Sequence, residues 1–107
     1  MKGLPGSMQA LMKQANQMQL KMKKTQEELA TREFEGTAGG GGVTVKVTGD
    51  NKICKVTINP DVVKSGDVEM LQDLILAATN DALKVAKETS QKEMEKITGG
   101  MNIPGLT

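Results

Sequence analysis

Apolar residues recur at heptad spacing along the first third of the chain. Six of them share one stripe of this pattern, with Thr25 at the weak position: Met8, Leu11, Ala15, Met18, Met22 and Leu29. Because positions seven residues apart lie on the same face of a helix, the spacing predicts an amphipathic helix over residues 7–31, with Ser7 as its N-cap. We call the six residues the methionine seam and interpret it as a surface that packs on another helix or on a second copy of the chain.

The middle of the chain changes to a two-residue alternation, which is typical of β-strands. Residues 43–48 alternate valine with polar residues, so that three valines share one face of a strand. Phe34 lies at an inward position of a weaker strand. The remaining segments are strands at 32–36 and 53–58 and turns at 39–42 and 49–52. Because the connections are short, residues 32–58 are predicted to form an antiparallel three-stranded sheet.

A second long helical pattern covers residues 67–97, with Asp67 as its N-cap. A single helical turn over 61–64 is expected before it, and a tail over residues 98–107 after it. The apolar face of the helix comprises Leu71, Leu74, Ile75, Ala78, Ala82, Val85, Ala86 and Ile97. The order helix, three strands, helix predicts one α+β domain over residues 1–107.

The lengths of these elements favour an oligomer. A six-residue strand spans about 20 Å, whereas helices of 25 and 31 residues span about 37 and 46 Å. Neither helix can therefore bury its whole apolar stripe on so short a sheet. The overhang is expected to pack on the other helix or on a second copy, which makes a two-fold dimer with helical arms the simplest assembly.

Composition removes most catalytic chemistry. Among 107 residues there are no His, Trp or Tyr, one Phe and one Cys, so the commonest acid, base and metal ligand is missing. The glycine run lacks the Lys and the following helix of a phosphate loop. Cys54 shares a predicted strand face with Val56 and Ile58, which indicates a packed small hydrophobe. We expect no enzyme activity, metal, cofactor or small-molecule substrate.

The lone cysteine and the lack of a signal-peptide pattern indicate a reducing, intracellular setting. No run of residues approaches the ~18 consecutive apolar residues that a membrane-spanning helix needs. The chain is therefore expected to be cytoplasmic, with no membrane partner.

The formal net charge is only +1, but its distribution is uneven. Residues 1–32 carry six basic and two acidic side chains, whereas the remaining 75 residues carry eight basic and eleven acidic ones. The basic residues of the first helix either form a solvated face or hold nucleic-acid phosphates, and the charge alone does not separate these readings. The scarcity of aromatic residues disfavours single-strand binding by base stacking.

Three segments in order resemble the YbaB/EbfC family of bacterial nucleoid-associated proteins. They are residues 11–22, which include Leu11-Met12-Lys13-Gln14-Ala15, then Asn80-Asp81-Ala82, and then Thr98-Gly99-Gly100-Met101 with Ile103-Pro104-Gly105. The resemblance implies a tweezer-like homodimer of α-β-β-β-α protomers. It also implies binding to duplex DNA with little sequence preference, and a role in nucleoid organisation or gene regulation.

The resemblance makes six lysines candidates for DNA contact. Lys13 and Lys21 lie inside a matched motif, and the others are added by their positions on the two helices: Lys23, Lys24, Lys84 and Lys87. A different class of function stays open, namely an adaptor or chaperone whose helical arms grip other proteins through a Met-rich surface. Salt-dependent binding to duplex DNA would distinguish the first class from the second.

Overall fold

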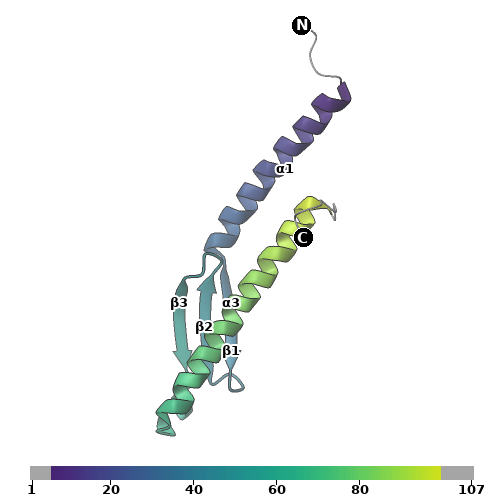
Figure 1. The fold of residues 1–107 in the computed structure, drawn as a ribbon. Coiled ribbons are helices and arrows are strands. Elements are labelled where there is room, and N and C mark those ends of the chain that lie inside the picture. Colours follow the sequence, from purple (N-terminus) through teal and green to yellow (C-terminus); the bar gives the residue numbers. More distant parts are fainter. Residues whose placement is uncertain (1–5, 100–107) are drawn as a thin grey trace.

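The computed structural model describes residues 6–99 and has the predicted α+β architecture (Figure 1). Its elements in chain order are α1 (Gly6–Thr31), β1 (Glu33–Ala38), β2 (Val43–Thr48), β3 (Ile53–Ile58), α2 (Pro60–Lys64) and α3 (Val68–Thr98). The part of the predicted tail at residues 100–107 lies outside the described residues, and Thr98 is the last residue of α3.

The sheet is the predicted antiparallel meander, with strand order β1-β2-β3. The glycine run forms the turn between β1 and β2, and Gly39, Gly40 and Gly41 all have positive φ angles. The Gly42 amide donates to the Gly39 carbonyl at 3.2 Å and closes the turn. Because residues with a Cβ rarely adopt three such conformations in succession, the run serves the backbone of a hairpin.

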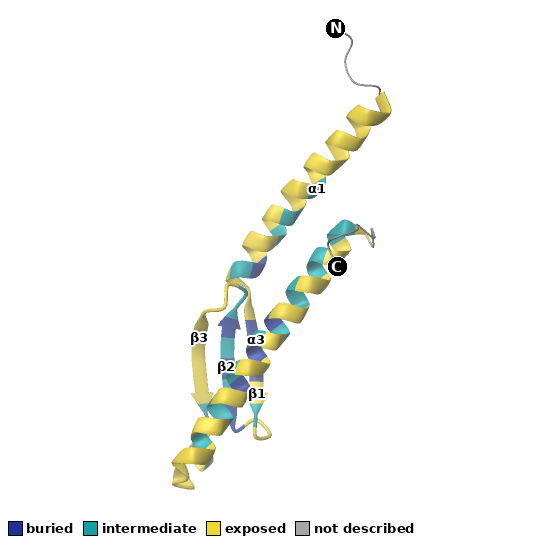
Figure 2. Ribbon diagram, in the orientation of Figure 1, coloured by how far each residue is buried: buried dark blue, intermediate teal, exposed yellow. Residues whose placement is uncertain are grey.

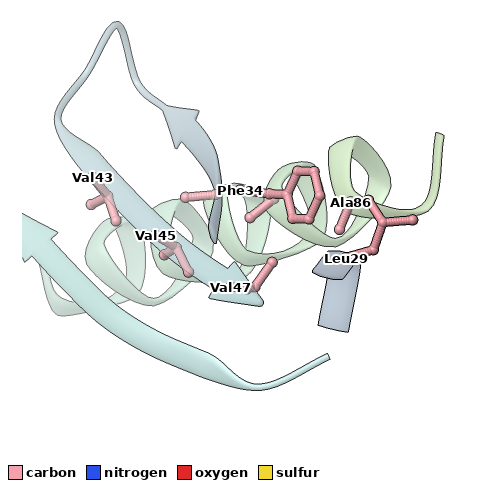
Figure 3. Close-up of a cluster of buried hydrophobic side chains, with 8 residues drawn as sticks. Leu29, Phe34, Val43, Val45, Val47 and Ala86 are labelled. Atoms are coloured by element: carbon pink, nitrogen blue, oxygen red, sulfur yellow. The ribbon is translucent and has the colours of Figure 1, made fainter. Parts of the chain in front are cut away.

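The core lies between one face of the sheet and the middle of α3. Val43, Val45 and Val47 of β2 are fully buried, as their alternation predicts. They face an alanine stripe on α3, formed by Ala78, Ala82 and Ala86 at intervals of four residues. Phe34 and Leu29 fill the end of the core beside Ala86 (Figure 3).

Gly36 brings β1 into direct contact with α3. A Cβ at this position would collide with the Ala82 amide nitrogen and the Ala78 carbonyl oxygen, which are backbone atoms of the helix. The neighbouring Thr37 amide donates to Oδ2 of Asp81 at 3.0 Å. The small alanines and Gly36 therefore let the helix and the strand approach closely, and Asp81 ties the two elements together.

The ends of the helices agree with the predicted bounds within a residue or two. Asp67 caps α3 by accepting a hydrogen bond from the Met70 amide at 2.9 Å, and Gly99 ends it in the left-handed conformation. Asn59 caps the short helix α2 in the same way. The prediction that Ser7 is the N-cap of α1 is wrong, because the helix already includes Gly6 and Ser7 therefore lies within it.

The prediction that Cys54 is a packed small hydrophobe is wrong. Cys54 is exposed, and the pairing of β2 with β3 shifts by one residue between Lys46 and Val47, so that Cys54 is bypassed. Its thiol donates to the Lys46 carbonyl at 3.3 Å. A one-residue irregularity moves a side chain to the opposite face of a strand. Ile53 consequently takes the place that the alternation assigned to Cys54, opposite Val47.

The two long helices extend beyond the sheet as arms, as the comparison of lengths predicts. The molecule is 78 Å long and 23 by 16 Å across. Figure 2 shows that burial is concentrated where α3 crosses the sheet, whereas most of α1 is exposed. The core thus holds only the sheet end of α1, through Leu29.

Candidate nucleic-acid interface

Two lysines of α1 lie on one face of the arm. Lys13 and Lys24 are both exposed, and the step of eleven residues from one to the other corresponds to three helical turns. At 1.5 Å per residue their Cα atoms are about 16 Å apart along the helix axis. Duplex DNA carries one phosphate charge per ~1.7 Å of its axis, so both ammonium groups can reach phosphates at once.

Lys21 and Lys23 widen this basic surface. Lys21 lies one turn before Lys24, and Lys23 lines a shallow, open hollow together with Asn16, Gln19 and Leu20. Amide side chains are common donors to phosphate oxygens. Asn16 and Gln19 were missed in the search for charged residues, although their spacing of seven and four residues from Lys23 places all three on one helix face.

Lys84 and Lys87 lie on the outward side of α3. Both are exposed, and they alternate with the buried Ala82 and Ala86 of the alanine stripe. Their three-residue spacing makes them neighbours on the helix surface. The structure therefore places all six candidate lysines in solvent, four of them on α1 and two, Lys84 and Lys87, beside the part of α3 that packs on the sheet.

Charge is separated along the molecule. The α1 residues 6–24 include four lysines and no acidic residue, whereas residues 61–81 include five acidic residues and one lysine. Figure 1 places these two segments at opposite ends of the long axis. Within residues 6–99 the ion pairs are Lys52 with Asp50 at 3.5 Å and Lys96 with Glu93 at 3.3 Å, so none involves a candidate lysine.

The methionine seam is divided into two halves. Leu29 is buried against the core, and Met18 and Met22 are half-buried on the side of α1 that continues from it. Met8, Leu11 and Ala15 are exposed. The second half of the seam therefore has neighbours within the chain, and the first half is open to solvent.

Metal sites and membrane-spanning helices are two further features to consider among residues 6–99. No three His, Cys, Asp or Glu side chains in this range are grouped so that they could hold a metal ion. Over the same residues, neither long helix combines the length and the apolar character that a membrane crossing requires.

A model of the YbaB/EbfC DNA-binding family matches residues 4–101, which include both arms and the sheet. The chain belongs to this family. Among its relatives, a nucleoid-associated protein of Alkaliphilus metalliredigens is 53% identical over 110 residues, covering 98% of this chain and 96% of the relative. A nucleoid-associated protein of Clostridium novyi is 56% identical over 106 residues, covering 97% of this chain and 93% of the relative.

A solved structure shows the same fold at lower sequence similarity. An uncharacterized protein from Helicobacter pylori superposes with a TM-score of 0.67 at 20% identity, covering 91% of this chain and all of that one. The YbaB/EbfC fold therefore accounts for the arrangement of arms and sheet.

The segment Asn80-Asp81-Ala82 of α3, on which part of the resemblance rests, has a structural role in this chain. Ala82 accommodates the close approach of Gly36, and Asp81 accepts the hydrogen bond from the Thr37 amide. Neither residue lies among the candidate lysines. The segment thus secures the helix on the sheet, from which the basic arm extends.

Proposed function

We propose that this YbaB/EbfC member is a nucleoid-associated protein that binds duplex DNA through phosphate contacts from its arms. The observation that carries the proposal is the stretch of α1 from residue 6 to residue 24, which has four exposed lysines and no acidic residue. The names of the family and of its relatives agree with this assignment. Although the net charge is +1, a DNA duplex near the arm meets a locally basic surface.

The chemistry of the arm favours little sequence preference. Lys side chains hold phosphates as point charges, and phosphate contacts position a protein without reading bases. Phe34, the one aromatic residue, is buried in the core with the Arg32 guanidinium 5.3 Å from its ring centroid. It is therefore not free to stack on an exposed base, which supports duplex rather than single-stranded DNA as the ligand.

We propose that the functional unit is a homodimer. Val56 and Ile53 pair with the buried Val45 and Val47 across the sheet, so their side chains are on the core face. They are nevertheless 45% and 56% exposed, because α3 lies over β1 and β2 rather than β3. An apolar strand face of this kind requires a cover, and a second copy supplies an identical and complementary surface.

A dimer presents two arms to DNA. Two separated phosphate-binding surfaces on one particle can bridge two duplex segments or bend one segment. Such a particle would act in nucleoid organisation or gene regulation, in the cytoplasm where the nucleoid lies. The six lysines remain our proposal for the DNA-contact residues, and the methionine seam remains our proposal for a packing surface of the arm.

The decisive experiment is a salt titration of binding to duplex DNA, comparing the unchanged protein with Lys13→Gln/Lys21→Gln/Lys24→Gln. If each lysine neutralises one phosphate, the triple change makes the negative slope of log K against log salt shallower by about 2.7 per chain. Affinity is expected to fall alike for unrelated DNA sequences.

A matched triple change at the sheet end, Lys46→Gln/Lys55→Gln/Lys64→Gln, removes the same net charge from outside the arm. It is expected to leave most of the salt slope in place. Equal losses in the two triple variants would show that total charge, not the arm, drives binding. If the unchanged protein does not bind DNA even at low salt, the proposal fails.

One observation keeps an adaptor or chaperone as the second candidate. Met8 and Met12 are 51% and 52% exposed, and flexible methionines suit promiscuous apolar contacts. Binding to unfolded protein that is insensitive to salt, without DNA binding, would favour this alternative.

A further inference from the structure

The first half of the methionine seam extends past the end of α3. Leu29 and Ala86 meet in the core, and from there α1 runs back toward its N-terminus while α3 runs toward its C-terminus (Figures 1 and 3). Thr98 lies twelve residues beyond Ala86, which corresponds to about 18 Å. The same distance back from Leu29 reaches the position of residue 17 on α1.

Burial along α1 changes at the level where α3 ends. Met18 and Met22 are half-buried, but every residue from 6 to 17 is exposed. This uncovered segment includes Met8, Leu11 and Met12, of which Leu11 is 65% exposed. Helical spacing places these three residues and Ala15 on one continuous face. The segment is about 18 Å long at 1.5 Å per residue.

The chain itself continues from the point where this cover ends. Eight residues follow Gly99, and three of them are large and apolar, namely Met101, Ile103 and Leu106. Eight extended residues reach up to about 26 Å. Crossing from one packed helix to its neighbour takes 8–10 Å, according to the usual distance between helix axes. The remaining reach of about 16–18 Å is close to the length of the uncovered segment.

The apolar spacings of the two segments also match. In an extended chain Met101 and Ile103 lie on one side about 6.6 Å apart, and residues four apart on a helix, such as Leu11 and Ala15, are separated by about 6 Å. Residues that precede a proline favour extended conformations, so the sequence Ile103-Pro104 suits a strap rather than another helical turn.

We propose that residues 100–107 bind along the exposed first half of the methionine seam of their own chain. The tail would run toward the N-terminus of α1, with Met101 near Ala15 and Leu106 near Met8. This contact covers the apolar face of the arm and leaves the outward Lys13 free for phosphate. It is independent of DNA binding and would hold if the proposed function failed.

The tail of the same chain is favoured over α1 of a second copy as the segment that covers this apolar face. The uncovered segment has only 12 residues, so a second copy of α1 would pack on it over only about three helical turns. A tail tethered at Gly99 is present at millimolar effective concentration, as for short flexible linkers, so it competes well with a separate chain.

Disulfide trapping in the full-length protein tests the contact. In a background with Cys54→Ser, the pair Met8→Cys/Thr107→Cys keeps all three apolar tail residues. The matched control is Ala10→Cys/Thr107→Cys, because Ala10 is exposed at almost the same height on the opposite face of α1. We expect the Met8 pair to form an intrachain disulfide roughly ten-fold faster than the control, in line with a higher effective concentration.

Two results of this experiment would overturn the proposal. Equal rates for the two pairs would mean that the tail samples all sides of the helix. Disulfides between chains, detected at twice the chain mass on a non-reducing gel, would assign the cover to a second copy.

Amide hydrogen exchange provides an independent measurement. A full-length variant with Met101→Ser, Ile103→Ser and Leu106→Ser is expected to lose protection over residues 6–17, with residues 33–58 unchanged. Unchanged exchange in both segments contradicts a tail contact on α1.

Discussion

Replacing Gly36 by alanine tests how β1 is seated on α3. The added Cβ would overlap the Ala82 nitrogen and the Ala78 carbonyl oxygen, and these are backbone atoms that cannot rotate away. The helix must therefore move off the strand, which also stretches the 3.0 Å hydrogen bond between the Thr37 amide and Asp81. Overpacking of this kind costs about 1–3 kcal/mol. Ala also has less conformational entropy than Gly in the unfolded chain, and this difference offsets about 0.4–1 kcal/mol of that cost.

Because the added Cβ meets backbone atoms, the upper end of the overpacking cost applies, and the expected net loss for Gly36→Ala is about 2 kcal/mol. This loss corresponds to a decrease in Tm of roughly 8–16 °C for a domain of this size. Thermal unfolding followed by circular dichroism measures it, at one protein concentration because the proposed dimer would make Tm depend on concentration. Gly6→Ala is the matched control, since a Cβ there meets nothing within 4 Å. An unchanged Tm for Gly36→Ala would refute the close contact between strand and helix.

Two further variants test the dimer surface and a turn. Val56→Lys is expected to convert the proposed dimer into a folded monomer in sedimentation experiments. The reason is that Val56 is exposed within one chain but lies on the apolar face of β3. The control Thr57→Lys, on the opposite face of β3, is expected to preserve the dimer. The Thr48 hydroxyl donates to Asp50 and lowers the pKa of that carboxyl, so Thr48→Val is expected to raise it toward its ordinary value in an NMR titration. Because the pKa of Asp50 is lower in the folded state, the ionised carboxylate stabilises the fold at pH values above the unfolded-state pKa, and this stability is lost as pH falls through the folded-state pKa. An unchanged Asp50 titration in Thr48→Val would contradict the role of the hydroxyl.

The periodic parts of the sequence predicted the fold well. The alternation in β2 placed Val43, Val45 and Val47 inward, and all three are fully buried. Periodicity failed at Cys54, because a one-residue shift in strand pairing reverses the face of a side chain without any mark in the hydrophobic pattern. The role of Gly36 also escaped prediction, since it depends on the helix backbone that crosses the strand.

The candidate site was predicted in a similarly uneven way. Net charge per segment identified the lysines of α1, and the structure places them in solvent. The same search could not find Asn16 and Gln19, because amides contribute hydrogen-bond donors without charge. The bare apolar face at Val56 was hidden as well, because a strand that looks buried by pattern is covered only if a helix reaches it.

Stability and the proposed DNA contacts depend on different parts of this chain. Asp81, Ala82 and Gly36 join α3 to the sheet, and changes there act on stability. Lys13 and Lys24 lie on the overhanging part of α1, outside the core, so their replacement removes charge without opening a cavity. On the proposed function, DNA affinity can therefore be raised or lowered along the arm while the folded scaffold stays intact. If the arm binds DNA as proposed, the charge of residues 6–24 predicts DNA binding better than the net charge of the whole chain does.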